Sequence, residues 1–215
     1  MNFSGRIGKD WRLKESMGHP DKPVGAGRSS FGLIDADKVF GVLPFKKGST
    51  FVDLGCGRGE YAVIAAQIVG LEGTVYAIDL WKEGIASLSK EAVDRGVKNL
   101  LPIVADVAKR VPLEDNSVDV CFMATVFHDL VLANVVDSAL TEVVRMLKRD
   151  GFLAILEFKK MDGPPGPPLT SRLAPPEVEK KVTRYGFDKK RITGTGPYTY
   201  LITFQLLREH GSVNG

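Results

Sequence analysis

The sequence predicts an α/β protein with three layers, in which helices cover both faces of a seven-stranded, mostly parallel β-sheet. Three observations carry this prediction. Short apolar segments that suit buried strands alternate with helical segments through the middle of the chain. A glycine-rich turn within FVDLGCGRGE (51–60) joins the first strand to the first long helix. Near the end, GTGPY separates two further strand-like segments, which indicates an antiparallel hairpin at the edge of the sheet.

The order of the elements follows from changes in apolar periodicity along the chain. A short helix capped by Asp35 is expected before the first strand. Pro175 and Pro176 suit the first turn of a late helix, because proline lacks the N–H that this turn leaves unpaired. The expected strands cover residues 50–54, 74–79, 100–106, 117–125, 152–158, 191–195 and 198–207. The expected helices cover residues 59–69, 82–96, 132–151 and 176–185.

A single domain is expected over residues 34–210, because 215 residues with 44% apolar content are enough for one sizeable core. Residues 1–33 are polar and rich in glycine, and we predict an arm or lid there, which contains His19. Residues 211–215 are expected to form a short tail. The N-terminus has no apolar signal core and no uncharged stretch is long enough to span a bilayer, so a cytoplasmic protein is expected.

The overall composition excludes several classes of function. A net charge of +3 is typical of an ordinary solvated surface and does not by itself indicate nucleic-acid binding. The two cysteines, Cys56 and Cys121, and the three separated histidines provide neither a disulfide framework nor metal-ligand spacing. No metal site is therefore expected, and a reducing compartment fits best.

The spacing of the glycine turn distinguishes between possible ligands. Dinucleotide-binding turns usually read G-x-G-x-x-G and hold a pyrophosphate, whereas this turn reads G-x-G-x-G with Asp53 two residues ahead. A carboxylate there would repel phosphate and suit an ammonium group. Asp79 and Asp106 end the next two strands, where they can accept hydrogen bonds from ribose hydroxyls and an adenine amino group. Together these residues describe a nucleoside with a cationic amino-acid tail, which is S-adenosylmethionine.

The chain resembles the class I S-adenosylmethionine-dependent methyltransferases of the Rossmann-like type, in the type 11 group with the ubiquinone/menaquinone C-methyltransferases. The resemblance lies in VDLGCGRGE, VYAID, VADVAKRVPLEDNSVDVCFMATVFHDL and RMLKRDGFLAILEF, which occur in the order and spacing of the family over about the middle half of the chain. The residues that it implies for cofactor binding are Asp53, Gly55, Cys56, Gly57, Asp79, Leu80, Trp81, Asp106, Val107, Met123 and Ala124.

The resemblance implies a role for each of these positions. The loop of residues 55–57 would pack under the methionine part, and Asp53 would orient the loop and the amino group, partly through water. Asp79 would bind the ribose hydroxyls, with its two following residues beside the adenine. Asp106 would meet the adenine amino group, with its following residue adjacent. Met123 and Ala124 would line the sulfonium side.

Each acidic residue also has a purely structural interpretation. Asp53 could serve only to hold the glycine loop, and Asp79 could cap the helix expected from residue 82. Asp106 could simply end its strand before a turn. Cys56 is interpreted as a small residue in a crowded loop.

Residues FHDL (127–130) follow the fourth strand, where the family places substrate-facing residues. We expect His128 as a candidate general base oriented by Asp129; in the alternative, His128 packs on the loop and Asp129 caps a helix. Glu157, Lys159 and Lys160 end the fifth strand and could also border the substrate. The arm, the loop after the fourth strand and the proline-rich loop after the fifth are predicted to build the acceptor pocket.

The leading hypothesis is methyl transfer to a small-molecule acceptor by in-line displacement, with S-adenosylhomocysteine as product. A basic cluster, EKKVTRYGFDKKR (179–191), leaves an RNA or protein methyltransferase as the alternative, although it also suits the solvated face of an edge helix. A non-catalytic cofactor-binding protein is a further alternative. The glycine spacing disfavours a nicotinamide-dependent oxidoreductase. Neither nucleic acid nor membrane insertion is expected, and the acceptor and the oligomeric state are not specified.

Overall fold

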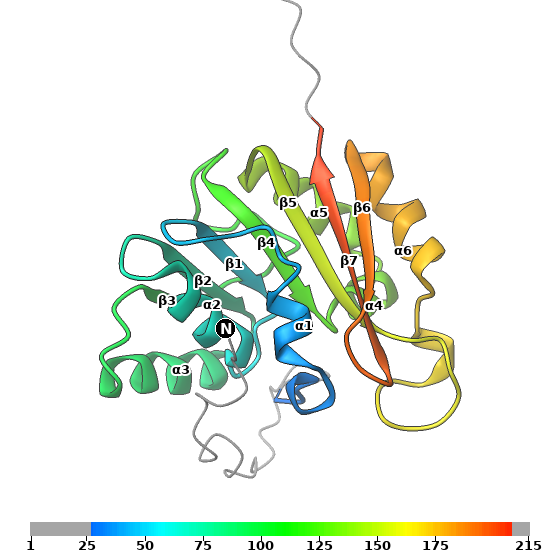
Figure 1. The fold of residues 1–215 in the computed structure, drawn as a ribbon, viewed down its shortest axis with the longest axis horizontal. Helices are drawn as coiled ribbons and strands as arrows, with labels where there is room; N and C mark the ends of the chain where they lie inside the picture. The colour runs from blue at the N-terminus through cyan, green and yellow to red at the C-terminus, as the bar shows by residue number, and fades with distance from the viewer. Residues whose placement is uncertain (1–26, 208–215) are drawn as a thin grey trace, which may run out of the picture.

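The structure of the protein, a computed structural model, describes residues 27–207. Its centre is a single seven-stranded sheet with the order β3-β2-β1-β4-β5-β7-β6 (Figure 1). Strands β1 to β5 run parallel, and β7 is antiparallel to both of its neighbours, β5 and β6. The strands are β1 (Thr50–Leu54), β2 (Thr74–Asp79), β3 (Leu100–Val104), β4 (Val118–Ala124), β5 (Leu147–Phe158), β6 (Phe187–Gly194) and β7 (Thr199–Leu206). The predicted fold class is therefore confirmed, including the antiparallel hairpin.

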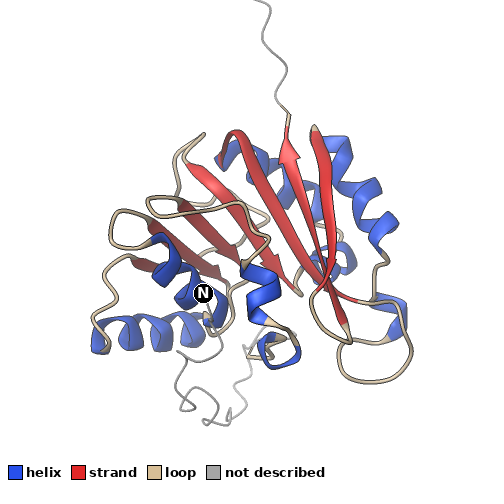
Figure 2. Ribbon diagram, in the orientation of Figure 1, coloured by secondary structure: helices blue, strands red, loops and turns tan. Residues whose placement is uncertain are grey.

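Helices cover both faces of the sheet and bury an apolar cluster on each (Figure 2). One cluster lies under α1 (Ala36–Phe40), α2 (Glu60–Val69) and α3 (Lys82–Asp94). The other lies under α4 (Phe127–Leu132), α5 (Val136–Met146) and α6 (Pro175–Val182). Side chains alternate between the two faces along a strand, so Phe51 belongs to the first cluster and its neighbour Val52 to the second. Short 3₁₀ turns complete the list of helices: η2 (Phe31–Leu33), η3 (Leu169–Ser171) and η4 (Thr183–Tyr185).

The predicted helix over residues 132–151 is wrong in its bounds. The chain forms α4 and α5 instead, and they are separated where Asn134 adopts a left-handed φ of 57°. Helix α5 ends at Met146 because Leu147 already pairs with Val118 of β4. Strand β5 therefore begins five residues before the predicted strand. The apolar periodicity of residues 136–146 indicates a helix, as observed, whereas the following residues, LKRDG (147–151), suit either a helix or a strand.

Other boundaries agree closely with the prediction. Asp35 caps α1, and its carboxylate accepts a hydrogen bond from the Lys38 N–H at 3.2 Å. Pro175 is the first residue of α6. Strand β6 begins at Phe187 rather than at 191, since charged residues are compatible with an edge strand. Strand β3 ends at Val104, two residues earlier than predicted.

The described part of the expected N-terminal arm is packed on the domain. Ser30 is buried, and the Phe31 ring meets the Tyr61 ring edge-on with centroids 5.1 Å apart. Residues 1–26, which include His19, and the tail after residue 207 lie outside the described residues. Within residues 27–207, the longest and most apolar helices fall short of what a membrane crossing requires.

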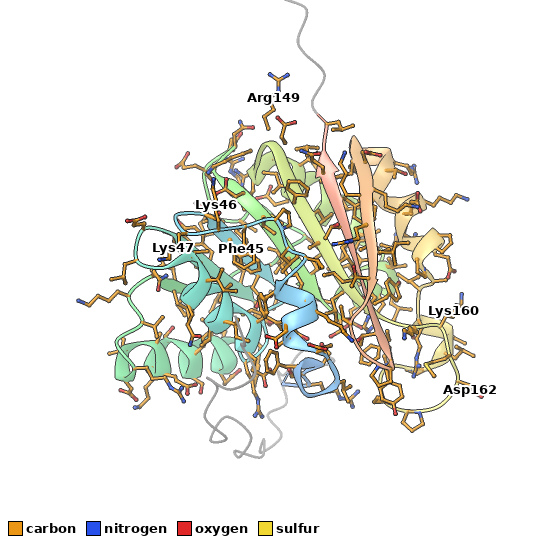
Figure 3. All side chains as sticks on the ribbon, in the orientation of Figure 1. Phe45, Lys46, Lys47, Arg149, Lys160 and Asp162 are labelled. Carbon is orange, nitrogen blue, oxygen red and sulfur yellow. The ribbon has the colours of Figure 1, made fainter. Side chains whose placement is uncertain are left out.

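The carboxyl ends of β1, β2, β4 and β5 lie along one edge of the sheet, and the loops that follow them gather there (Figure 1). Figure 3 shows Lys160 and Asp162 on the loop after β5, while Lys46, Lys47 and Arg149 lie toward the opposite edge. Ligands of open α/β sheets bind outside the carboxyl ends of the strands. The site is therefore expected at these carboxyl ends, where the loop after β5 lies.

Candidate functional site

Two of the three glycines in the turn after β1 are required by close packing. Gly55 and Gly59 have left-handed φ values of 73° and 78°. A Cβ atom on Gly55 would lie 2.7 Å from a methyl group of Val126, and one on Gly59 would lie 2.4 Å from a methyl group of Leu88. A side chain at either position would have to displace Val126 or Leu88, and it would also adopt a backbone conformation that favours glycine. These glycines therefore set the shape of the turn.

Gly57 has the same left-handed backbone, with φ of 56°, but it faces open space. The atom nearest to a Cβ built on Gly57 would be the carbonyl oxygen of Arg28, 4.0 Å away. The Gly57 N–H donates to Asp79 Oδ2 at 2.8 Å. The turn thus presents bare backbone beside the N-terminal segment, which is the geometry that a closely approaching ligand needs.

Asp79 ties the glycine turn to the end of β2. Its Oδ2 accepts from Gly57, and its Oδ1 accepts from the Trp81 N–H at 2.8 Å. The cap of α3 is Trp81, so the predicted alternative in which Asp79 caps this helix does not describe the structure. Each carboxylate oxygen has a second lone pair, and Asp79 is only half-buried. Ribose hydroxyls could therefore still donate to it.

The residues after Asp79 form an apolar ledge. The Trp81 ring packs over Gly84 so tightly that a Cβ on Gly84 would lie 2.2 Å from it. Leu80 is 51% exposed, which leaves apolar surface beside the turn. This ledge has the character that an adenine ring needs.

Asp106 organises the turn after β3. Its Oδ1 accepts from the Ala108 N–H at 2.9 Å, and its Oδ2 lies 3.5 Å from Lys109 Nζ. The side chain is 27% exposed, so it can still reach a ligand. The Val107 side chain points into the core and lies in the cluster under α4 to α6. An adenine contact at residue 107 would have to involve its backbone.

Asp53 is the most unusual carboxyl group among the described residues. It is fully buried on β1, and neither of its side-chain oxygens has a hydrogen-bond partner there. Burial, together with the nearby charges of Asp79 and Glu60, raises the pKa of Asp53 to about 8, although the Ala62 backbone acts in the opposite direction. An unpaired buried carboxyl is costly, and a cation is the partner that would relieve it. The unpaired Asp53 carboxyl fits the ammonium group of a methionine tail and disfavours a phosphate.

The end of β4 differs from the prediction in detail. Met123 is fully buried in the core cluster on the α5 face, which argues against a side-chain contact with the sulfonium. Ala124 is half-buried and packs against the opposite cluster. The next residue, Thr125, has a φ of 54°, which is rare for a β-branched residue. No sequence pattern predicts this conformation at Thr125, because threonine does not favour it.

A cavity of about 560 Å³ lies where the three predicted segments meet. Its volume is within the range of small-molecule sites. The described N-terminal segment, the loop and helix after β4, and the proline-rich loop after β5 all contribute to it. Its lining residues are Arg28, Ser29, Ser30, Leu33, Thr125, His128, Asp129, Leu132, Phe158, Pro165, Gly166, Pro167, Pro168 and Ser171.

His128 is held at the cavity wall by Glu157. The His128 Nδ1 atom lies 3.0 and 2.9 Å from the two carboxylate oxygens of Glu157, and the His128 backbone N–H donates to the same carboxylate at 3.0 Å. Glu157 is fully buried at the end of β5. Because a carboxylate only accepts hydrogen bonds, Nδ1 carries a hydrogen and the neutral ring keeps its lone pair on Nε2.

The surroundings of His128 favour its protonated form. Burial lowers the pKa of His128, but the hydrogen bond and charge of Glu157, with a contribution from Asp129, outweigh burial and raise it above the ordinary value. Asp129 Oδ1 lies 3.5 Å from Nε2. Asp129 lies in the first turn of α4, and the cap of the next helix, α5, is Val135, so the alternative in which Asp129 caps the next helix is wrong. Glu157, rather than Asp129, is the residue that orients the imidazole.

Hydrogen bonds join the N-terminal segment to helix α2 and to the loop after β4. Ser30 Oγ lies 2.9 Å from the hydroxyl of Tyr61 on α2 and accepts from Thr125 Oγ1 at 3.2 Å. Ser29 also donates to the carboxylate of Glu60. This segment therefore bridges the glycine turn and the cavity. The predicted arm thus contributes to the pocket, whereas sequence patterns do not indicate the Ser30–Thr125 hydrogen bond, because its partners are 95 positions apart.

The lysines after β5 are occupied elsewhere. Lys159 Nζ donates to the carbonyls of Gly196 and Pro197 at 3.0 Å each, and Lys160 pairs with Glu177 at 2.9 Å. Neither lysine lines the cavity, so the predicted alternative in which they border the substrate is not what the structure shows.

Comparisons with known proteins agree with this geometry. Residues 52–155 match the model of a methyltransferase domain. The crystal structure of an S-adenosylmethionine-dependent methyltransferase from Aquifex aeolicus is 30% identical, covers 83% of this chain and 93% of its own, and superposes with a TM-score of 0.76. The chain belongs to the S-adenosylmethionine-dependent methyltransferases.

Curated members of this methyltransferase family resemble the middle of the chain. The demethylmenaquinone methyltransferase of Lactobacillus johnsonii is 28% identical over 127 residues, which are 59% of this chain and 51% of that protein. The ubiquinone/menaquinone C-methyltransferase of Ectopseudomonas mendocina is 32% identical over 136 residues, 63% and 49% of the two chains. The chain thus spans about half the length of the curated relatives that it matches.

Proposed function

We propose that the protein transfers a methyl group from S-adenosylmethionine to a small-molecule acceptor by in-line displacement and releases S-adenosylhomocysteine. The observation that carries the proposal is the position of the cavity. Arg28 both lines the cavity and approaches the exposed backbone of Gly57, so the acceptor space directly adjoins the cofactor turn. The His128–Glu157 pair stands on the wall of that space.

The cofactor assignments rest on the contacts of the turns after β1, β2 and β3. Asp53 compensates the ammonium group, and Gly55 to Gly57, with Cys56 between them, form the floor under the methionine part. Asp79 receives the ribose hydroxyls with its remaining lone pairs. Asp106 receives the adenine amino group. The apolar ledge after Asp79 supports the adenine face.

S-adenosylmethionine, when bound, supplies a methyl group on a sulfonium, which is a good leaving group. The chain's task is therefore to place and desolvate the acceptor and to accept its proton. His128 Nε2 takes the proton from the attacking oxygen, nitrogen or carbon as the new bond to the methyl carbon forms. The Glu157 carboxylate holds the ring and stabilises the imidazolium that results.

The walls of the cavity indicate the acceptor's character. The polar lining residues are Arg28, Ser29, Ser30, Thr125, His128, Asp129 and Ser171. The apolar lining residues are Leu33, Leu132, Phe158 and the prolines. Such a mixed lining suits a largely apolar molecule with one acidic hydroxyl or amino group. Relatives named for demethylmenaquinone and aklanonic acid support an acceptor of this kind.

The alternative of a nucleic-acid or protein methyltransferase receives no such support. In the basic cluster of residues 179–191, Lys189 pairs with Glu179 and Lys190 with Asp188. Val178 and Val182 are fully buried, so the charges lie on the outer face of α6 and the edge strand. A cytoplasmic location is part of the proposal, and it is supported by two buried cysteines that remain free thiols.

The proposal is tested with S-adenosylmethionine labelled on its methyl group and a panel of phenols, naphthols and enols. We expect label in at least one extracted acceptor with wild-type protein and about a thousandfold less with His128→Gln. NADH should not compete with the cofactor. Cofactor binding without turnover on any acceptor, or transfer only to RNA with a steep salt dependence, would contradict the proposal.

A further inference from the structure

A guanidinium group lies buried inside the proline-rich loop. Arg172 is 3% exposed, whereas the loop residues 160–164 around it are exposed. Its five N–H groups all donate to backbone carbonyls, which belong to alternate residues of the loop. The bonds run from Nε to Pro167 (2.8 Å), from Nη1 to Met161 (2.6 Å) and Lys159 (3.4 Å), and from Nη2 to Gly163 (2.6 Å) and Pro165 (3.0 Å).

The composition of the loop explains why it needs such a side chain. Residues 163–168 read GPPGPP, and their four prolines have no N–H to donate. The segment therefore carries more carbonyl acceptors than it can pair with its own donors. Arginine has donors and no acceptor, in a fixed planar fork. Arg172 thus supplies from one point the donors that the prolines lack.

The same loop forms the apolar wall of the cavity. Residues 165–168 line it, together with Phe158. The Arg172 Cζ atom lies 5.8 Å from the centroid of the Phe158 ring. A Cβ on Gly166 would lie 2.7 Å from that ring, so the loop touches Phe158 directly. The Arg172 guanidinium, the Phe158 ring and the loop therefore pack together. Residues 165–168 of this loop also face the acceptor space.

We propose that Arg172 is a positioning residue for the acceptor: by gathering the carbonyls of residues 159–167, its guanidinium fixes the wall on which the acceptor's apolar body packs. Arg172 is absent from the cavity lining and acts through that wall. The inference rests on the proposed function in taking this cavity as the acceptor site. It assigns the fit of the acceptor, and not the binding of the cofactor, to this side chain.

The first test is hydrogen exchange of the full-length protein with Arg172→Lys, which keeps the charge but has three donors without the planar fork. Arg184→Lys, at an exposed arginine of η4, is the matched control. We expect the amides of residues 159–171 to exchange at least about tenfold faster in R172K and to be unchanged in R184K. Unchanged exchange in the loop, or an equal increase across the whole sheet, would overturn the proposal.

The second test separates acceptor fit from cofactor binding. Calorimetry with 1-naphthol as the apolar hydroxyl probe should show at least about fivefold weaker binding to R172K than to wild type, with S-adenosylhomocysteine affinity equal within about twofold. Equal naphthol binding by both proteins, or no binding by either, would contradict the role of the wall. Failure of wild type to bind S-adenosylhomocysteine would instead contradict the proposed function and leave the exchange result standing.

A rescue experiment checks that the guanidinium is what matters. Arg172→Ala should show the same fast exchange in the loop, and ethylguanidinium should restore protection. Ethylammonium, which has the charge without the fork, should not restore it. Equal rescue by the two cations would show that charge alone suffices, and would overturn the proposed gathering of carbonyls.

Discussion

In the turns after β1, β2 and β3, which we call the cofactor half, carboxylates at the ends of strands hold backbone N–H groups: Asp79 holds those of Gly57 and Trp81, and Asp106 holds that of Ala108. In the segments that surround the cavity, which we call the acceptor half, side chains from different segments pair with one another instead. His128 and Glu157 are 29 positions apart. The methyltransferase-domain match spans residues 52–155 and stops before Glu157 and the proline-rich loop. The match therefore covers the whole cofactor half and only part of the acceptor half.

We expect that the two halves can be disabled separately. Variants of the cofactor half should weaken cofactor binding, and variants of the acceptor half should slow transfer at unchanged cofactor affinity.

The largest effect is expected at His128. Replacing it with Gln keeps the size of the side chain and removes the base, so kcat should fall about a thousandfold. In wild type the rate should rise with pH through a pKa above the ordinary value for histidine, since the neutral ring is the base. Glu157→Gln removes the largest contributions that raise this pKa and leaves burial, which lowers it, with only Asp129 acting against burial, so the inflection should move to lower pH. A pH–rate profile that does not respond to Glu157→Gln would remove His128 from the reaction.

Asp79→Ala should have the next largest effect, on cofactor affinity. It removes the acceptor of two backbone N–H groups and the expected ribose contact, which together correspond to about a hundredfold weaker binding of S-adenosylhomocysteine, or about 2.7 kcal/mol. Asp94→Ala, at an exposed aspartate of α3, is the control. Undiminished affinity would break the assignment of the cofactor half.

Asp53→Asn should change the pH dependence of stability. A carboxyl with pKa about 8 in the folded protein and about 4 when unfolded binds more protons in the folded state between these values. Wild type should therefore lose up to about 1.4 kcal/mol per pH unit from this group as pH rises toward 8. Denaturant unfolding at pH 5, 6.5 and 8 should show a smaller loss for Asp53→Asn, together with about tenfold weaker cofactor binding. Equal slopes for the two proteins would contradict the raised pKa.

The smallest effect is expected at Thr125, where the two halves meet. Asparagine tolerates a left-handed φ better than a β-branched residue, so Thr125→Asn should stabilise the protein by about 1 kcal/mol. Thr193→Asn, in strand β6, is the control and should lose stability because asparagine suits strands poorly. A loss at both positions would show that the hydrogen bond to Ser30 matters more than the backbone strain.

Sequence patterns indicate candidate residues in the cofactor half more readily than contacts in the acceptor half, for a physical reason. Glycine spacing and acidic residues at strand ends are local patterns, and the fold brings strand ends together at one edge. The sequence also indicated the three segments that line the cavity. It did not reveal the pairing of His128 with Glu157, or the carbonyls around Arg172, because such contacts depend on tertiary packing. Met123 shows a subtler limit, since alternation along β4 turns its side chain into the core.

The most direct test of the separation is one calorimetric titration of S-adenosylhomocysteine into wild type, Asp79→Ala and His128→Gln. We expect wild type and His128→Gln to bind S-adenosylhomocysteine tightly, with affinities within about twofold of each other, and Asp79→Ala to bind it about a hundredfold more weakly. Equal losses in both variants, or none in either, would contradict the division of the site into a cofactor half and an acceptor half.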